Sequence, residues 1–134
     1  MRFFAIVLVA LLLVAQGCRT TAPLLNVSNA PLGTSPGSQA SLEDVSRAIW
    51  AAGKKLGWEI QQVRPGELTG TLNLRKHQAV VAITHDTSTF SINYRGSLNL
   101  RQHDGEIHRN YNNWVNNLRD LSRPRWSARG SGAS

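Results

Sequence analysis

The four histidines are the residues of this sequence best suited to proton transfer or metal binding, because an imidazole can do both near neutral pH. His77 and His85 stand at opposite ends of one predicted strand, ~26 Å apart at about 3.3 Å per residue, so they cannot share a metal ion within one subunit. His103 and His108 flank a short acidic segment, but their five-residue spacing does not form a ligand pair on a helix or a strand. We interpret both as solvated loop residues and expect neither a metal nor another cofactor.

The other side chains do not form patterns typical of nucleophilic or acid–base catalysis. No serine lies in a G-x-S-x-G turn, which would expose its hydroxyl between a strand and a helix. Glu59, Glu67 and Asp86 are candidates for paired carboxylates, but nothing in their spacing fixes two of them at a working distance. Surface charge explains all three, so we predict that the protein is not an enzyme.

The first seventeen residues have the pattern of an export signal. Arg2 gives a positive start, and Phe3–Ala15 is an uninterrupted run of thirteen apolar residues. At about 1.5 Å per residue, a helix of that length spans about 20 Å, which is short of the ~30 Å hydrocarbon core of a bilayer. A charged start, a short apolar run and then small residues are typical of a cleavable signal peptide, which we assign to residues 1–17.

The segment that ends this pattern, Val14–Cys18, resembles the lipobox of bacterial lipoproteins, although Ala15 stands where leucine is commonest. The resemblance implies that the chain is cut between Gly17 and Cys18, that the Cys18 sulfur carries a diacylglycerol, and that the new amine is acylated. Arg19 follows the cysteine, where lipoproteins retained in the inner membrane often have aspartate. This implies an anchor in the outer membrane that faces the periplasm. The alternative is a free cysteine beside an ordinary signal peptide.

The distribution of charge argues against a nucleic-acid partner. The formal net charge is +7, but residues 41–123 hold eleven Lys and Arg against eight Asp and Glu. The other four basic residues lie in the flanks: Arg2, Arg19, Arg125 and Arg129. A nucleic-acid-binding domain concentrates its basic residues on the folded surface, whereas this chain places more than half of the excess outside it.

Two segments have the composition of irregular chain. Residues 18–40 are rich in Pro, Gly, Ser, Thr and Asn and have no acidic residue, so we expect a lipidated cysteine followed by a flexible tether. Residues 124–134 are similar, and we expect a disordered basic tail there. The predicted folded domain is the part between them, residues 41–123.

Hydrophobic periodicity predicts one helix and four strands in the first part of this domain. An apolar helical stripe from Leu42 to Leu56 follows Ser41, a residue type that caps helix N-termini, and ends before Gly57, a residue suited to the end of a helix. Alternating apolar residues then predict four strands between Trp58 and Tyr94. Their connections are short, which requires antiparallel neighbours and therefore a meander.

A second helix closes the predicted domain. Its apolar stripe runs from Ile107 to Leu121, with Asp104 or Gly105 at its start, and Pro124 forbids its continuation. Each helix has one apolar stripe and the sheet needs one cover. We therefore expect an α+β fold made of a helix, a four-stranded antiparallel meander and a helix, with both helices on one face of the sheet.

Two groups of residues are candidates for contact with a protein partner. Asn110, Asn113 and Asn117 belong to a run of five asparagines within eight residues of the second helix. Such a row of amides either faces a polar partner or is an uncharged, solvated face. Trp50 lies off the apolar stripe of the first helix, where it either wraps the edge of the core or is an exposed contact residue.

Four residues near the C-terminus combine guanidinium groups with an indole: Arg123, Arg125, Trp126 and Arg129. This combination suits an anionic membrane surface or a polyanion. The alternative is an inert basic end.

These features predict a lipid-anchored lipoprotein of the outer membrane, facing the periplasm, that acts as a non-catalytic protein-binding or envelope-assembly module. Its expected partners are the membrane, through the lipid on Cys18, and an envelope protein. An alternative is a module that binds glycan, lipopolysaccharide or an anionic surface. A small periplasmic enzyme is the third hypothesis.

Overall fold

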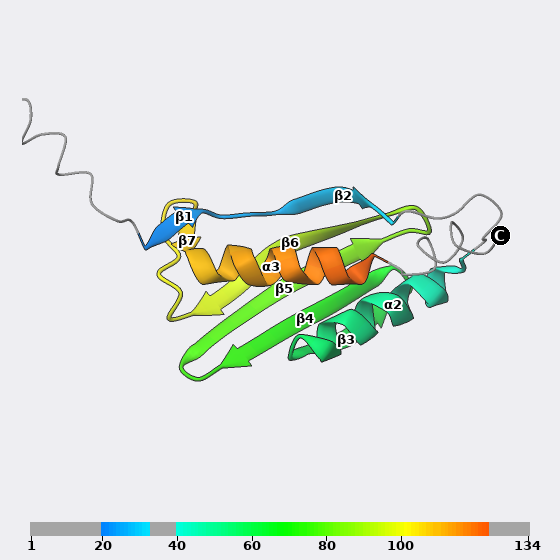
Figure 1. The fold of residues 1–134 in the computed structure, drawn as a ribbon, viewed down its shortest axis with the longest axis horizontal. Coiled ribbons are helices and arrows are strands. Elements are labelled where there is room, and N and C mark those ends of the chain that lie inside the picture. Colours follow the sequence, from blue (N-terminus) through cyan, green and yellow to red (C-terminus); the bar gives the residue numbers. More distant parts are fainter. Residues whose placement is uncertain (1–19, 33–39, 124–134) are drawn as a thin grey trace, which may run out of the picture.

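The computed structural model describes residues 20–32 and 40–123, which form an α+β fold with a layer of helices against a β-sheet (Figure 1). The elements in chain order are β1 (Thr21–Pro23), β2 (Val27–Pro31), α2 (Leu42–Lys55), β3 (Trp58–Arg64), β4 (Glu67–Leu74), β5 (His77–His85), β6 (Thr89–Leu98), β7 (Glu106–His108) and α3 (Arg109–Ser122). The main sheet has five strands in the order β2-β6-β5-β4-β3, and β1 pairs with β7 in a separate two-stranded sheet.

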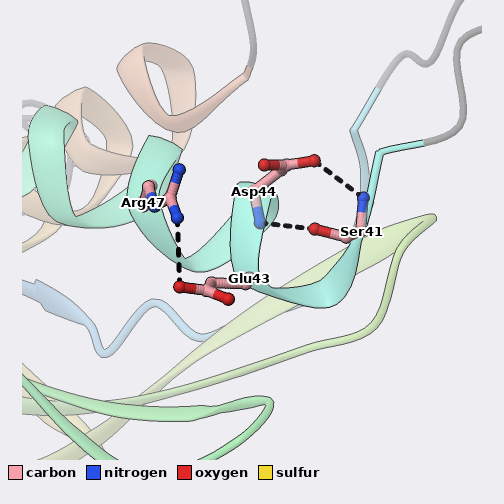
Figure 2. A network of polar contacts seen from close by, with 4 residues as sticks. All are labelled: Ser41, Glu43, Asp44 and Arg47. Atoms are coloured by element: carbon pink, nitrogen blue, oxygen red, sulfur yellow. Dashed lines mark hydrogen bonds and ion pairs between the residues drawn. The ribbon is translucent and has the colours of Figure 1, made fainter.

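Helix α2 begins with a capping box at the serine that the sequence predicts as its N-cap (Figure 2). The Ser41 hydroxyl accepts a hydrogen bond from the backbone N–H of Asp44 at 3.1 Å, and the Asp44 carboxylate accepts one from the backbone N–H of Ser41 at 3.0 Å. Glu43 and Arg47 form an exposed ion pair at 3.1 Å on the same part of the helix. After the helix, Gly57 adopts a φ of 91°, a conformation that glycine takes without steric cost.

Strands β3 to β6 are antiparallel neighbours in chain order. The β3–β4 connection is Pro65–Gly66, and Gly66 has a φ of 83°, as the third position of a type II turn requires. One face of these strands carries the buried apolar side chains of the core: Trp58, Ile60, Leu68, Leu72, Ala79, Val81, Ile83, Phe90 and Ile92. Because the residues between them are mainly Thr, Gln, Asn and Ser, the opposite face is polar.

Both helices lie on the apolar face of the sheet and contact each other (Figure 1). Helix α2 adds Val45 and Ile49 to the core, and α3 adds Tyr111, Val115 and Leu118. All five side chains are fully buried. One continuous core therefore joins the two helices to the sheet.

The second helix begins later than the sequence analysis predicts. Helix α3 spans Arg109–Ser122, so Asp104 and Gly105 precede it by several residues. Ile107, which fits the helical stripe, lies instead in β7 (Glu106–His108) and is fully buried there. A buried residue just before a helix extends the apparent stripe, and a strand of three residues is too short for alternation to reveal it.

The expectation of a flexible tether over residues 18–40 is wrong for residues 20–32. These residues form β1, which pairs with β7, and β2, which pairs with β6 at one edge of the main sheet. Val27, Ala30 and Leu32 are buried in the core. The domain therefore starts earlier than predicted, and its main sheet has five strands instead of four.

We expect the capping box to support α2 in a pH-dependent way. The hydrogen bonds from the Ser41 backbone N–H and hydroxyl hold the pKa of Asp44 below its ordinary value of 3.8. A carboxyl with a lowered folded-state pKa stabilises the fold above its unfolded-state pKa, and this contribution is lost as the pH falls through the folded-state pKa. In urea unfolding, Asp44→Asn should therefore lower the free energy of unfolding at pH 7 and have much less effect at about pH 2. Ser41→Ala should cost about 1 kcal/mol at pH 7. Equal effects of Asp44→Asn at both pH values would contradict this account.

Candidate functional site

The two edges of the main sheet differ in how well they are protected against pairing with another polypeptide strand. At one edge, β2 ends at Pro31, which has no N–H to donate, and its pairing register shifts between Val27 and Ala30, where Asn29 has a φ of 51°. At the other edge, β3 (Trp58–Arg64) contains no proline and pairs only with β4 within the described residues. Such an edge presents unpaired backbone N–H and C=O groups that an extended polypeptide can bind.

The surface between α2 and β3 is hollowed in three places, with volumes of about 390, 300 and 130 Å³. The hollow of about 300 Å³ is lined by Trp50, Lys54, Trp58, Glu59, Ile60 and Gln61. The other two continue along the same helix and are lined by Leu42, Glu43, Ser46, Arg47, Trp50, Gln62, Pro65 and Leu68. We call the three hollows together the α2–β3 groove.

Trp50 occupies the middle of the α2–β3 groove, since it lines two of the three hollows. Its side chain is 47% exposed, and the Lys54 Nζ lies 4.7 Å from the centre of its ring, in a cation–π contact. Trp58, which lines the same hollow from β3, is only 3% exposed. Trp50 therefore stands at the margin of the core, with much of its ring accessible to another molecule.

The asparagine run of α3 divides into exposed and structural members. Three of its residues are exposed on the helix: Asn110, Asn113 and Asn117. None of these three lines the α2–β3 groove, so the structure does not bring them together with Trp50. Asn112 instead holds the N-terminal segment, because its side-chain oxygen accepts from the Leu25 N–H at 3.0 Å and its amide donates to the Pro23 carbonyl at 2.9 Å. The sequence gives no sign of this role, because both partners lie more than 80 residues away along the chain.

Beside the groove, a serine and a histidine that the sequence analysis does not pair are in hydrogen-bond contact. The Oγ of Ser46, on α2, lies 2.7 Å from the Nε2 of His85, at the end of β5. The His85 Nδ1 lies 3.2 Å from the backbone carbonyl of Asp86. A carbonyl can only accept, so in the neutral imidazole Nδ1 carries the proton and Nε2 accepts from the Ser46 hydroxyl, as in a nucleophile–base pair.

The position of Ser46 nevertheless argues for a structural role. It lies within α2, where backbone N–H groups bond to carbonyls four residues earlier. The backbone next to the hydroxyl therefore has no free N–H with which to stabilise an oxyanion. We interpret the Ser46–His85 hydrogen bond as a tie between α2 and the sheet.

The carboxylates considered for acid–base chemistry have separate surroundings. Glu67 forms an ion pair across the β3–β4 turn at 3.0 Å, and Glu59 lines the α2–β3 groove. Asp86 accepts hydrogen bonds from the backbone N–H groups of Thr89 and Ser88, both at 2.7 Å, and these bonds lower the pKa of its carboxyl. Asp86 thus serves the β5–β6 turn, and no two of the three carboxylates share a hollow of the groove.

The other histidines do not assemble a metal site in the part of the chain that the structure describes, where no group of three metal-binding side chains occurs. His77 stands at the opposite end of β5 from His85. His103 is exposed and pairs with the neighbouring Asp104 at 2.9 Å. His108 caps α3, because its Nδ1 accepts a hydrogen bond from a backbone N–H of the first turn at 3.2 Å.

Several predicted site residues lie outside the described residues: Gly17, Cys18, Arg125, Trp126 and Arg129. The same holds for the predicted signal peptide and most of the predicted tail. Arg123 is described and is exposed directly after α3. Within residues 20–32 and 40–123, no helix is both long enough and apolar enough to cross a membrane.

No protein-family model matches the chain, and no curated protein or solved structure is significantly similar to it. A functional proposal therefore rests on the sequence and on the geometry of the described residues.

The two tryptophans of the groove should differ sharply in their effect on stability. Trp58→Ala removes a side chain that is 3% exposed and should lower the free energy of unfolding by ~3–5 kcal/mol. Trp50→Ala removes a half-exposed ring and one cation–π contact, so it should cost about 1 kcal/mol or less. Urea unfolding of both variants measures the difference, and similar losses would show that Trp50 is part of the core.

Proposed function

We propose that the protein is a bacterial lipoprotein, anchored in the outer membrane through lipid on Cys18, whose periplasmic domain docks an envelope protein without catalysing a reaction. The observation that carries the docking function is the unpaired edge of β3 beside the exposed ring of Trp50. The anchor is supported by the lipobox resemblance of Val14–Cys18.

Lipid on Cys18 would attach the domain to the membrane. Each buried CH₂ group contributes about 0.8 kcal/mol to membrane binding, and two or more acyl chains hold a protein stably at a bilayer. A cysteine that carries a diacylglycerol and an acylated amine meets that requirement. Arg19 favours the outer membrane over the inner one.

The docked partner segment is extended and adds a strand to β3. Backbone hydrogen bonds to the free side of β3 supply affinity in this binding mode, and pockets for alternate side chains supply specificity. The three hollows of the α2–β3 groove follow one another along the strand and suit that purpose. Trp50 between them provides a large, rigid contact of the kind that often dominates binding energy.

The lipid anchor can be tested through Cys18. Expressed in a bacterium with an outer membrane, the parent chain should sediment with outer-membrane vesicles, and its intact mass should show loss of residues 1–17 and addition of acyl chains. Cys18→Ser should keep its unprocessed mass and lose the acyl modification, because the serine hydroxyl does not replace the thiol nucleophile in lipid transfer. An unmodified thiol in the parent protein would refute the anchor.

The docking surface can be tested with a photo-cross-linking residue in place of Gln61, which lies on β3 and lines the groove. In intact cells it should form a cross-link to protein, and Trp50→Ala should reduce the yield about tenfold, as expected for loss of a central aromatic contact. The control places the same residue at Asn93, an exposed position on β6 away from both edges of the sheet. Equal yields from the two positions would contradict docking at β3.

Deletion of residues 124–134 separates this function from the alternative of glycan or lipopolysaccharide binding through the basic tail. The docking proposal predicts that the cross-link from position 61 persists in the truncated chain. Its loss would favour the alternative.

A further inference from the structure

We propose that one end of the domain lies directly on the membrane and binds anionic phospholipid headgroups through its basic side chains. This end, which we call the anchor-proximal end, consists of Thr20, β1, β7, the β4–β5 turn and residues 99–105. The proposal rests on the lipid anchor at Cys18 and adds a second contact, separate from the α2–β3 groove.

The proposed anchor and the folded domain are separated by only a short distance along the chain. Only one residue separates Cys18 from Thr20, so the two Cα atoms are at most about 7 Å apart. Thr20 is held to the domain, because its carbonyl accepts a hydrogen bond from the Arg109 N–H at 3.1 Å and its hydroxyl accepts one from the Arg101 guanidinium at 3.2 Å. A lipid on Cys18 would therefore keep this end of the domain close to the bilayer surface.

Several segments that are far apart in the sequence meet at this end of the domain. The Asn99 amide donates to the Lys76 carbonyl at 2.6 Å, which ties residues 99–105 to the β4–β5 turn. The rings of His77 and His108 lie 6.5 Å apart between centroids, which brings the start of β5 close to β7. Figure 1 shows β1, β7 and the β4–β5 turn at the same end of the long axis of the molecule.

The charge at this end matches an anionic surface. Its basic residues are all exposed: Arg75, Lys76 and Arg101. It also holds two acidic side chains: Asp104, which lies 2.9 Å from the His103 ring, and Glu106, which accepts a hydrogen bond from the Thr21 hydroxyl at 3.4 Å. The three basic side chains therefore leave this end with a net positive charge. Lysine and arginine side chains held close to an anionic leaflet are attracted to it within about a Debye length of ~10 Å.

The backbone at this end departs from the local preferences of its residues. Five non-glycine residues in the described chain have a positive φ, and four of them lie here: Arg75, Asn99, Arg101 and Asp104, between 48° and 58°. Asparagine and aspartate tolerate this conformation, but arginine does not favour it. Arg75 is the first residue of a two-residue hairpin turn, where a positive φ favours glycine. Strain of this kind is retained mainly where a site depends on it, and here it places Arg75 and Lys76 at the tip of the hairpin.

The test uses the lipidated full chain in vesicles of phosphatidylcholine with and without phosphatidylglycerol. An introduced cysteine is the only free thiol when Cys18 is lipidated, so Lys76→Cys and Thr87→Cys can each carry one fluorescent label. Position 76 is in the β4–β5 turn, and position 87 is in the β5–β6 turn at the other end of β5. Spin-labelled headgroups should quench the label at position 76 much more strongly than the label at position 87, and more strongly in anionic vesicles.

Charge removal then separates headgroup binding from simple proximity to the anchor. The label is then placed on Asn99→Cys, and quenching reports the ratio of headgroup-bound to unbound domain. The double variant Arg75→Gln, Lys76→Gln should lower this ratio about tenfold in anionic vesicles, and high salt should have the same effect. The matched control, Arg47→Gln, Arg64→Gln, also removes two exposed basic residues, and it should leave quenching unchanged.

Each outcome has a separate meaning. Failure of the parent chain to sediment with either vesicle would refute the anchor and, with it, the proposed function. Sedimentation with equal quenching at positions 76 and 87 would overturn the present inference and leave the anchor and the groove standing. Headgroup binding would be overturned if quenching at position 76 did not respond to anionic lipid or salt and quenching at position 99 did not respond to the double variant, because proximity alone would then explain the quenching.

Discussion

The single apolar face of the sheet is the constraint on which the rest of the structure depends. Alternation in β3 to β6 places the apolar side chains on one side, where α2 and α3 cover them. Burial of this face fixes the positions of both helices, because each has one apolar stripe. It also fixes which surfaces remain free: the polar face of the sheet, the outer sides of the helices and the two sheet edges. The α2–β3 groove exists because the helix that covers the core reaches the edge strand, so that Trp50 stands beside unpaired backbone.

The parts of the fold that depend on local pattern could be predicted from the sequence, and the parts that depend on distant pairing could not. Helix α2, its cap at Ser41 and the Pro65–Gly66 turn follow from residues that are neighbours in the chain. Residues 20–32 have the composition of a linker, yet β1 pairs with β7 and β2 with β6. Their order comes from backbone ladders and from Asn112, which bonds to a segment almost ninety residues away. Short strands of this kind have too few side chains to show a period.

The same distinction applies to the candidate site. The sequence singles out Trp50, because an indole off the apolar stripe of a helix is conspicuous. It cannot show that Trp50 adjoins an open edge, since that depends on the order of strands in the sheet. Nor can it pair Ser46 with His85, which lie 39 residues apart and meet only when α2 packs on β5. The exposed asparagines of α3 were equally conspicuous, but the structure separates them from the groove, and the run serves partly to hold the N-terminal segment.

The ordering of residues 20–32 changes what an anchor at Cys18 would do. On a flexible tether of some twenty residues, the domain would sample positions tens of ångströms from the bilayer and all orientations. With Thr20 fixed to the domain, a lipid on Cys18 would instead keep β1 and β7 close to the bilayer and leave the other end of the long axis farther from it. Helix α2 and β3 run along that axis, so the α2–β3 groove would extend from the bilayer side toward the periplasm (Figure 1). A binding surface held in one orientation loses less rotational freedom when it binds, so a partner fixed in the same envelope would meet it at a lower entropic cost.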